Sequence, residues 1–230
     1  EDGEIWNNQA SYLQEKFQLL IPDLPGSGKS ELINDMSMEG MAEVIKEIIE
    51  LEVSEVPRSG GFRGATCPII GHSMGGYIAL ALTHTYYNHV SALGLFHSSA
   101  FADSEEKKAT RQKGIEFINA NGAFEFLKTA IPNLFAPASK DEKPELIDEL
   151  VAAAHNFSAP ALVSYYEAMM QRFDRTEVLK NSKVPVLFIM GKYDAAVPVE
   201  DVLKQCHLPE KSYIHILQFS GHMGMLEEPD

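Results

Sequence analysis

The sequence has 230 residues, of which 45% are hydrophobic and 23% charged, and this is enough apolar material for one large core. Its formal net charge of −14 would repel a phosphate backbone, which argues against nucleic acid as a partner. No apolar run approaches the length of a membrane span, so the sequence predicts no transmembrane segment.

Cysteine usage and the start of the chain bear on cellular location. The two cysteines, Cys67 and Cys206, are interpreted as reduced thiols of a cytoplasmic protein rather than as a disulfide. No basic segment followed by an apolar one opens the sequence, in keeping with this location. The sequence begins at Glu1 without a Met, so a removed signal peptide stays open as an alternative.

Apolar runs bounded by turn residues alternate with amphipathic stretches. The runs are mostly continuous and rich in Ile, Leu and Val, which is typical of parallel strands buried on both faces. In chain order, the pattern predicts a helix at 5–15, a strand at 17–22, a helix at 38–50 with Ser37 as its N-cap, strands at 67–70 and 92–96 with a helix at 77–87 between them, a strand at 184–190, a short helix at 199–205 and a strand at 213–219. This alternation predicts a doubly wound α/β fold with a mostly parallel sheet. A Gly/Arg-rich stretch at 56–65 is expected to be an exposed, mobile loop.

Residues 103–175 break the alternation, because they contain four helical stretches and no clear strand. Their start and stop signals are the capping-box spacing of Asp103 and Glu106, a stop at Gly122, and prolines near helix starts at Pro144 and Pro160. We predict that this segment is a helical cap inserted over the carboxyl edge of the sheet, while residues 1–102 and 176–230 form the core. Its aromatic and methionine side chains either line an acyl pocket or pack between cap helices.

Gly71-His72-Ser73-Met74-Gly75 stands between a predicted strand and a predicted helix. In a Gly-x-Ser-x-Gly elbow the serine lies on a sharp, strained turn that lifts its Oγ clear of the sheet. Glycine is expected on both sides because side chains there would collide with neighbouring backbone. We therefore predict Ser73 as a nucleophile and the Met74 backbone N–H as an oxyanion donor, and the alternative is an ordinary glycine-rich turn.

This motif resembles the nucleophile elbow of the α/β-hydrolase superfamily. Asp23-Leu24-Pro25-Gly26-Ser27-Gly28-Lys29-Ser30 resembles that family's D-x-P-G-x-G-x-S turn, and the resemblance follows nearly the whole chain in order. It implies an α/β-hydrolase fold and a triad in the order serine, acid, histidine. Asp194 follows the strand at 184–190 and His222 follows the strand at 213–219, so Asp194 is expected to be the acid and His222 the base.

Other residues compete for these roles. Asp103 follows the strand at 92–96 and is the alternative acid, although its capping spacing suggests a helix-start role instead. His97, at the end of the same strand, is a candidate lining residue of the pocket. His72, inside the elbow, is interpreted as a packing or hydrogen-bonding residue rather than as the base.

The segment Gly26-Ser27-Gly28-Lys29-Ser30 superficially resembles a phosphate-binding loop. That loop requires a glycine five positions before Gly28, where this sequence has Asp23, and no helix begins directly after Ser30. We therefore expect no nucleotide binding and a solvent-facing Lys29.

Together these residues predict two-step acyl transfer that requires no metal or organic cofactor. The expected substrate is a small molecule, a fairly apolar acyl ester or thioester, with lactone opening, C–C hydrolysis and perhydrolysis as related chemistries. Ser73 argues against dehalogenases and epoxide hydrolases of the superfamily, which carry aspartate at the elbow. A small-molecule receptor or signalling protein that kept the triad is the alternative. The sequence does not indicate the oligomeric state.

The resemblance also implies parts that the printed sequence does not contain. The second oxyanion donor of the family comes from a His-Gly loop that would precede Glu1. A further helix would follow His222, where residues 223–230 remain. We therefore expect the sequence to be an interior part of a longer chain that lacks N-terminal strands and a C-terminal helix.

Overall fold

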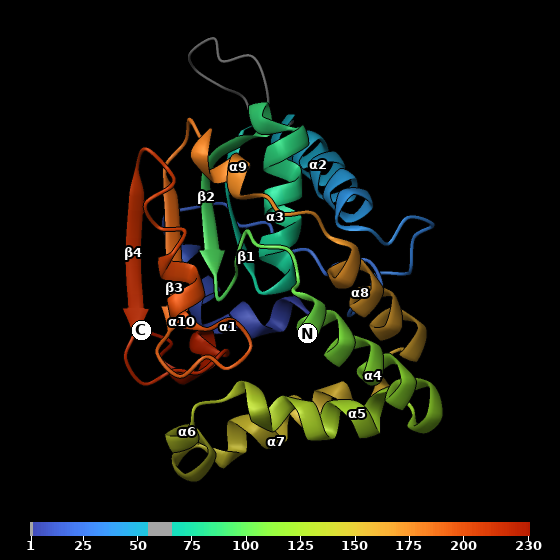
Figure 1. The fold of residues 1–230 in the computed structure, drawn as a ribbon. Coiled ribbons are helices and arrows are strands. Elements are labelled where there is room, and N and C mark those ends of the chain that lie inside the picture. Colours follow the sequence, from blue (N-terminus) through green and yellow to red (C-terminus); the bar gives the residue numbers. More distant parts are fainter. Residues whose placement is uncertain (1, 55–65) are drawn as a thin grey trace.

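A single parallel sheet forms the centre of the molecule. The computed structural model describes residues 2–54 and 66–230, so the loop predicted at 56–65 lies outside the described residues. Within these ranges four strands pair in the order β1-β2-β3-β4, and all three pairings are parallel. The strands are β1 (Cys67–His72), β2 (Val90–Phe96), β3 (Val186–Gly191) and β4 (Ser212–Leu217). Their carboxyl ends therefore meet at one edge (Figure 1).

Four of the five predicted strands form with ends shifted by one or two residues, but the strand predicted at 17–22 is wrong. This segment pairs with no other strand in the described part of the chain. Phe17 and Ile21 are exposed, and so is Ile70 on β1, which is an edge strand among the described residues. An apolar run becomes a strand only where its N–H and C=O groups find a neighbouring ladder, and hydropathy does not report that neighbour.

Helices on the sheet bury the apolar faces that the sequence indicated. Ser37 caps α2 (Met38–Ser54), because its Oγ accepts the Gly40 N–H at 3.0 Å. Met41 of α2 packs in one buried cluster with Leu82 of α3 (Met74–Thr85). The other helices outside the segment between β2 and β3 are short: the 3-10 helices Gly3–Trp6 and Tyr87–His89, α1 (Asn7–Leu13), α9 (Thr176–Lys180), α10 (Val199–Leu203) and α11 (Gly224–Glu227). No helix in the described ranges is both long and apolar enough to cross a membrane, and both cysteines are free thiols.

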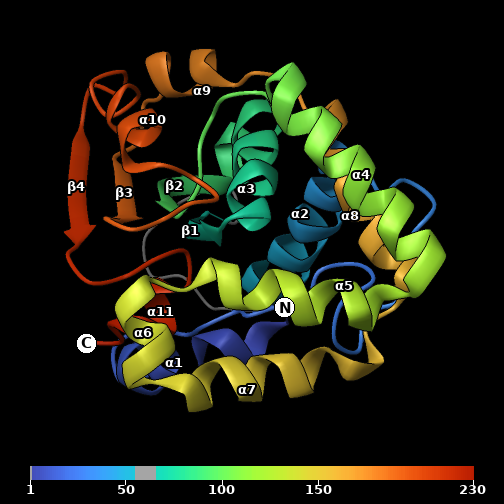
Figure 2. The ribbon, with the colours of Figure 1, turned by 60° about the horizontal axis from the view of Figure 1, so that its bottom comes forward.

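Helices fill the segment between β2 and β3, as predicted, although α-helices number five rather than four within 103–175. They are α4 (Glu105–Asn121), α5 (Ala123–Ala130), α6 (Pro137–Glu142), α7 (Pro144–Ala153) and α8 (Ala159–Gln171). Figure 1 shows α5, α6 and α7 beyond the arrowheads of the strands, and the turned view of Figure 2 shows this group curving past the sheet into α4 and α8. The segment thus lies at the edge where functional groups of parallel α/β sheets gather.

The first of these helices starts differently from the prediction. Ser104, not Asp103, is its N-cap, and the Ser104 Oγ accepts the Lys107 N–H. The Asp103 carboxylate is instead buried between two guanidinium groups, with Arg111 at 2.6 Å and Arg172 at 2.9 Å. Charge-assisted bonds to the two guanidinium groups hold the carboxylate, so it does not act as a cap. The capping-box interpretation of Asp103 is therefore wrong, and its carboxylate instead links the start of α4 to the end of α8.

Candidate active site

The elbow between β1 and α3 holds Ser73 in a rare backbone conformation. Its φ of +51° lies in the left-handed region, which non-glycine residues seldom enter. The turn is held from both sides, since the Ser73 N–H donates to the Phe96 carbonyl at 2.9 Å and the Ser98 hydroxyl donates to the Ser73 carbonyl at 2.8 Å. The Met74 amide opens α3 and so has no acceptor inside the helix, which leaves it available to an oxyanion.

Of the two glycines that flank Ser73 in the motif, Gly71 is sterically required and Gly75 is not. A Cβ at Gly71 would overlap the Gly75 backbone, as the motif predicts. A Cβ at Gly75 would meet nothing within 4 Å, so that part of the prediction is wrong. The close approach is made one residue later, where a Cβ on Gly76 would overlap Ser98. Helix α3 therefore packs against the end of β2 through Gly76.

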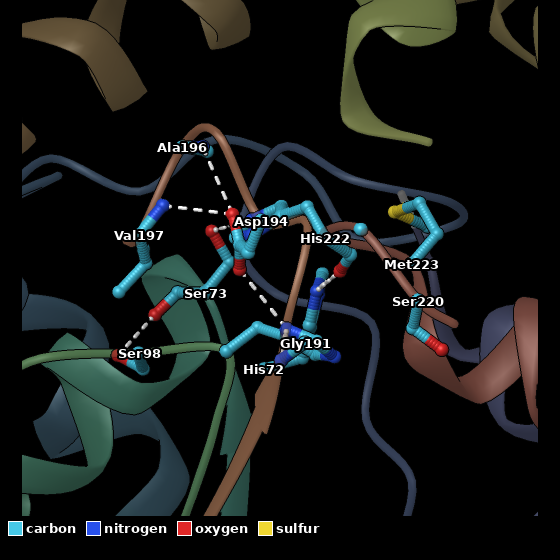
Figure 3. A network of polar contacts seen from close by, with 12 residues as sticks. His72, Ser73, Ser98, Gly191, Asp194, Ala196, Val197, Ser220, His222 and Met223 are labelled. Atoms are coloured by element: carbon cyan, nitrogen blue, oxygen red, sulfur yellow. Dashed lines mark hydrogen bonds and ion pairs between the residues drawn. The ribbon is translucent and has the colours of Figure 1, made fainter. Parts of the chain in front are cut away.

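Ser73, His222 and Asp194 form a continuous hydrogen-bonded chain. The Ser73 Oγ lies 2.8 Å from the His222 Nε2, and the His222 Nδ1 lies 2.8 Å from the Asp194 Oδ2. Asp194 comes from the turn after β3 and His222 from the loop after β4. Figure 3 shows the three side chains converging from these separate segments. The arrangement can pass a proton from a serine hydroxyl to an imidazole whose other nitrogen is held by a carboxylate.

The Asp194 carboxylate accepts a bond on every side. Its Oδ1 accepts the N–H groups of Ala196 at 2.9 Å and Val197 at 2.8 Å (Figure 3). Its Oδ2 accepts from His222 and also from His97, at 3.0 Å. Burial alone would raise the pKa of Asp194, but the charge and hydrogen bond of His222, with the bond from His97, outweigh it and hold this pKa well below its usual range. The group is therefore an anion at neutral pH.

The other candidate residues raised by the sequence are not among the three residues of this hydrogen-bonded chain. The Asp103 carboxylate pairs with Arg111 and Arg172, so it is not the residue that contacts His222. The His72 Nε2 donates to the His222 carbonyl at 2.9 Å, a hydrogen-bonding role of the kind that the sequence suggested. His97 is fully buried and is not among the residues that line the cavity at Ser73, so its predicted place in the pocket wall is wrong.

Glu227, which sequence reasoning missed, holds the loop that carries His222. One carboxylate oxygen accepts the N–H groups of Gly221 at 2.8 Å and Met223 at 3.2 Å. The other accepts the Ala136 N–H and the Ser139 hydroxyl, both at 2.7 Å. The side chain is almost fully buried. It thereby joins the His222 loop to the start of α6, and no pattern in a single sequence marks an acid of this kind.

Replacing Glu227 by Gln should therefore loosen the His222 loop. A Gln amide nitrogen would face hydrogen-bond donors on whichever side it lies, so we expect a loss of about 2–3 kcal/mol in the free energy of unfolding. Displacement of His222 should also lower turnover by about 10–100-fold. Urea unfolding and initial rates would measure both, with the exposed Glu210→Gln as control. Wild-type values in both assays would contradict this role of Glu227.

A cavity of about 1650 Å³ opens at Ser73 and His222. One part of its wall comes from the helical segment, including Phe126, Leu162 and Tyr166, and another part runs along residues 17–22 and β1. Arg111 is the one cationic side chain of the wall among the described residues. The walls are mostly apolar, so the cavity can take an apolar group next to the serine.

Potential metal ligands gather in one place within the described chain. Ligand atoms of His97, Asp194 and His222 lie within 4.8 Å of one another. However, the Nδ1 atoms of both histidines already contact the Asp194 Oδ2, and a metal ion here would have to displace these bonds. The cluster is explained by hydrogen bonding around a buried carboxylate, and we assign no metal to it.

The turn at 23–30 is closed by its own aspartate. The Asp23 carboxylate accepts the Lys29 N–H and the Gly3 N–H, both at 3.0 Å, and these bonds lower the pKa of Asp23. A Cβ on Gly28, which has a φ of +52°, would overlap this carboxylate. An anionic side chain therefore occupies the amides that a phosphate would need.

We accordingly expect no ATP binding at this turn. Lys29 is exposed, and repulsion between Asp23 and a phosphate would oppose binding. Isothermal titration of ATP into the wild type and Lys29→Ala should give the same heats as buffer. A binding heat that disappears in Lys29→Ala would contradict this expectation.

Comparison with known proteins identifies the family of this chain. The chain matches the family described as "Alpha/beta hydrolase family" over residues 2–230. It belongs to the alpha/beta hydrolase family. The predicted fold is thereby confirmed, because the match extends over nearly the whole chain and the sheet and helices fit this fold.

Several relatives of this alpha/beta hydrolase are named as hydrolases of different kinds. A 2-hydroxy-6-oxo-6-(2'-aminophenyl)hexa-2,4-dienoic acid hydrolase from Metapseudomonas resinovorans is 24% identical, over 98% of this chain and 74% of the relative. A 3-oxoadipate enol-lactonase 2 from Acinetobacter baylyi is 22% identical, over 98% of this chain and 79% of the relative. The structure of a thermophilic esterase from Thermogutta terrifontis superposes with a TM-score of 0.89 at 25% identity, over 99% and 81% of the two chains. These names support a hydrolase, while the bond that is cleaved differs among them.

Proposed function

We propose that this alpha/beta hydrolase is a serine hydrolase that cleaves small, fairly apolar acyl esters or thioesters. Ser73 is the nucleophile, His222 the general base and Asp194 the acid that orients it. The observation that carries the proposal is the chain of two 2.8 Å contacts, from the Ser73 Oγ through the His222 ring to the Asp194 carboxylate. The strained backbone of Ser73 supports it, because such strain gathers at functional sites.

The reaction runs in two steps. His222 Nε2 takes the hydroxyl proton as the Ser73 Oγ attacks the carbonyl carbon, and Asp194 stabilises the imidazolium. The Met74 N–H donates to the developing oxyanion, and the proton on His222 then passes to the leaving alcohol or thiol. Water, deprotonated by His222, next attacks the acyl-enzyme and releases the carboxylic acid and free Ser73.

Residues 103–175 would act as the cap of this enzyme, over a core of residues 1–102 and 176–230. Phe126, Leu162 and Tyr166 from the helical segment line the same cavity as Ser73, which supports a role in acyl binding. Their apolar surface favours a fairly apolar acyl group. The cap is held to the core by the Arg172 guanidinium, which donates to the Phe101 carbonyl at 3.0 Å, and by the Tyr165 hydroxyl, which donates to the Pro25 carbonyl at 2.6 Å.

A panel of p-nitrophenyl esters of increasing acyl length, with matched thioesters, tests the proposal. We expect repeated turnover of the shorter esters and covalent labelling by a fluorophosphonate. A single burst of one equivalent without further turnover would favour a receptor that keeps the triad. Absence of both turnover and labelling in folded protein would contradict a serine hydrolase.

A further inference from the structure

His97 places a second imidazole against the proposed acid. It is the first residue after β2, and its side chain is fully buried. Its Nδ1 lies 3.0 Å from the Asp194 Oδ2, the same oxygen that faces the His222 Nδ1 at 2.8 Å. The two rings are inclined at 65° to one another, with centroids 5.6 Å apart. One carboxylate oxygen is therefore shared by two histidines, of which the proposed mechanism uses one.

The backbone at His97 is held in an unfavourable conformation. Its φ is +50°, and among the described residues Ser73 is the only other non-glycine residue with a positive φ. The His97 N–H donates to the Ile189 carbonyl at 2.8 Å, which continues the pairing of β2 with β3. Side chains at such positions are aimed away from the direction that a regular strand would give them. Strain of this kind persists where surrounding contacts enforce it.

Two glycines make room for the His97 ring. A Cβ on Gly191, at the end of β3, would lie 2.8 Å from the His97 Cε1. A Cβ on Gly224, at the start of α11, would overlap the His97 Nε2. The ring therefore fits tightly between the β3 end and the segment after His222, which leaves it little freedom to turn away from Asp194.

The protonation of His97 follows from its neighbours. The charged and titratable groups around its ring are Asp194, His222 and His72, with the His72 ring centroid 5.9 Å away. Burial lowers the pKa of His97 to about 4, although its bond to Asp194 acts in the opposite direction, so the ring is neutral at pH 7. The Gly191 N–H also points at Nδ1, at 3.2 Å, but a bare Nδ1 would set a lone pair against the carboxylate. We therefore place the proton of the neutral ring on Nδ1, and the Nε2 has no partner among the described residues.

We propose that His97 is a positioning residue for Asp194, whose neutral Nδ1–H holds the carboxylate toward His222 and takes up part of its negative charge. The proposal rests on the triad proposed above. Without this donor, the Asp194 Oδ2 would carry more negative charge, and its hydrogen bond to the protonated His222 would be stronger. His222 would then hold its proton to higher pH, and the acidic limb of the kcat/KM profile, which reports the free enzyme, would move with it.

A matched pair of substitutions separates the donor from the backbone strain. Glycine and asparagine both accept a positive φ, but only asparagine can place an N–H donor near the position of Nδ1. In His97→Gly we expect the acidic limb to rise by about one pH unit and kcat/KM on its plateau to fall about 10-fold. In His97→Asn both quantities should stay near wild type. An unshifted limb in folded His97→Gly, or equal shifts in both variants, would overturn the proposal.

Nitrogen NMR of the histidine rings gives a readout that does not depend on turnover. In the wild type we expect the His97 ring to stay neutral, with its proton on Nδ1, from pH 8 down to about pH 5. The His97→Asn spectrum assigns its signals among the eight histidines by their loss. A proton on Nε2, or a charged ring at pH 7, would overturn the proposal. If the wild type hydrolyses no ester, the proposed function fails, and the tautomer still decides whether His97 donates to Asp194.

Discussion

Ser73→Ala should abolish turnover and covalent labelling while leaving the fold intact. The Ser73 Oγ is the atom that lies 2.8 Å from the His222 Nε2, and alanine removes it without adding bulk to the elbow. Loss of a triad nucleophile lowers kcat by about 10⁶-fold in a well-studied serine protease, and we expect a loss of similar size here. Fluorophosphonate labelling followed by intact-mass measurement reports the nucleophile directly.

A remote serine provides the control for this substitution. The Ser182 hydroxyl donates to the Val184 carbonyl in the connection that leads to β3, away from the cavity. Ser182→Ala should keep both labelling and turnover. If Ser73→Ala is labelled as strongly as the wild type, the nucleophile is another residue, and peptide mapping of the labelled protein would identify it.

Asp194→Asn should lower kcat by about 10⁴-fold with little change in the backbone. All four contacts of this carboxylate are with donors: the N–H groups of Ala196 and Val197 and the Nδ1 atoms of His97 and His222. An asparagine must turn its NH₂ group toward one of these pairs. The His222 ring would then lose the partner that fixes its tautomer, or the turn after β3 would lose its amide bonds.

Asp103→Asn is the matched control, because the sequence alone left Asp103 open as the alternative acid. Its carboxylate pairs with Arg111 and Arg172, so the substitution should lower the melting temperature and leave the pH profile of turnover in place. The assignment of Asp194 fails if Asp103→Asn abolishes turnover and Asp194→Asn does not.

The fold class and the three proposed triad positions could be predicted from local patterns. Ser73, Asp194 and His222 each directly follow a strand or lie in the turn after one, and each strand was recognisable as an apolar run bounded by turn residues. The carboxyl ends of parallel strands share one edge of the sheet, and the resemblance to the family's serine, acid, histidine order singled out these three side chains as the ones expected to meet there. The Ser37 cap was also predictable, because a helix cap depends on residues within one turn.

Features that depend on a distant partner were not predictable in this way. The run at 17–22 has the composition of a strand, yet strand formation requires a neighbouring ladder that the described residues do not supply. Asp103 has the spacing of a cap, yet its carboxylate is taken by Arg111 and Arg172. In both cases a local signal is present, and a tertiary contact or its absence among the described residues decides the outcome.

The sequence by itself therefore determined which strands lead to the site and which side chains stand at their ends. The tertiary structure alone decided what those side chains bond to. His97 meets Asp194 across 97 residues of chain, and Glu227 meets Ala136 across 91. The contact between His97 and Asp194 depends on the positive φ of His97 and on the space beside Gly191 and Gly224. Both depend on how distant backbone segments pack together, and residue type and spacing along the sequence do not report this packing.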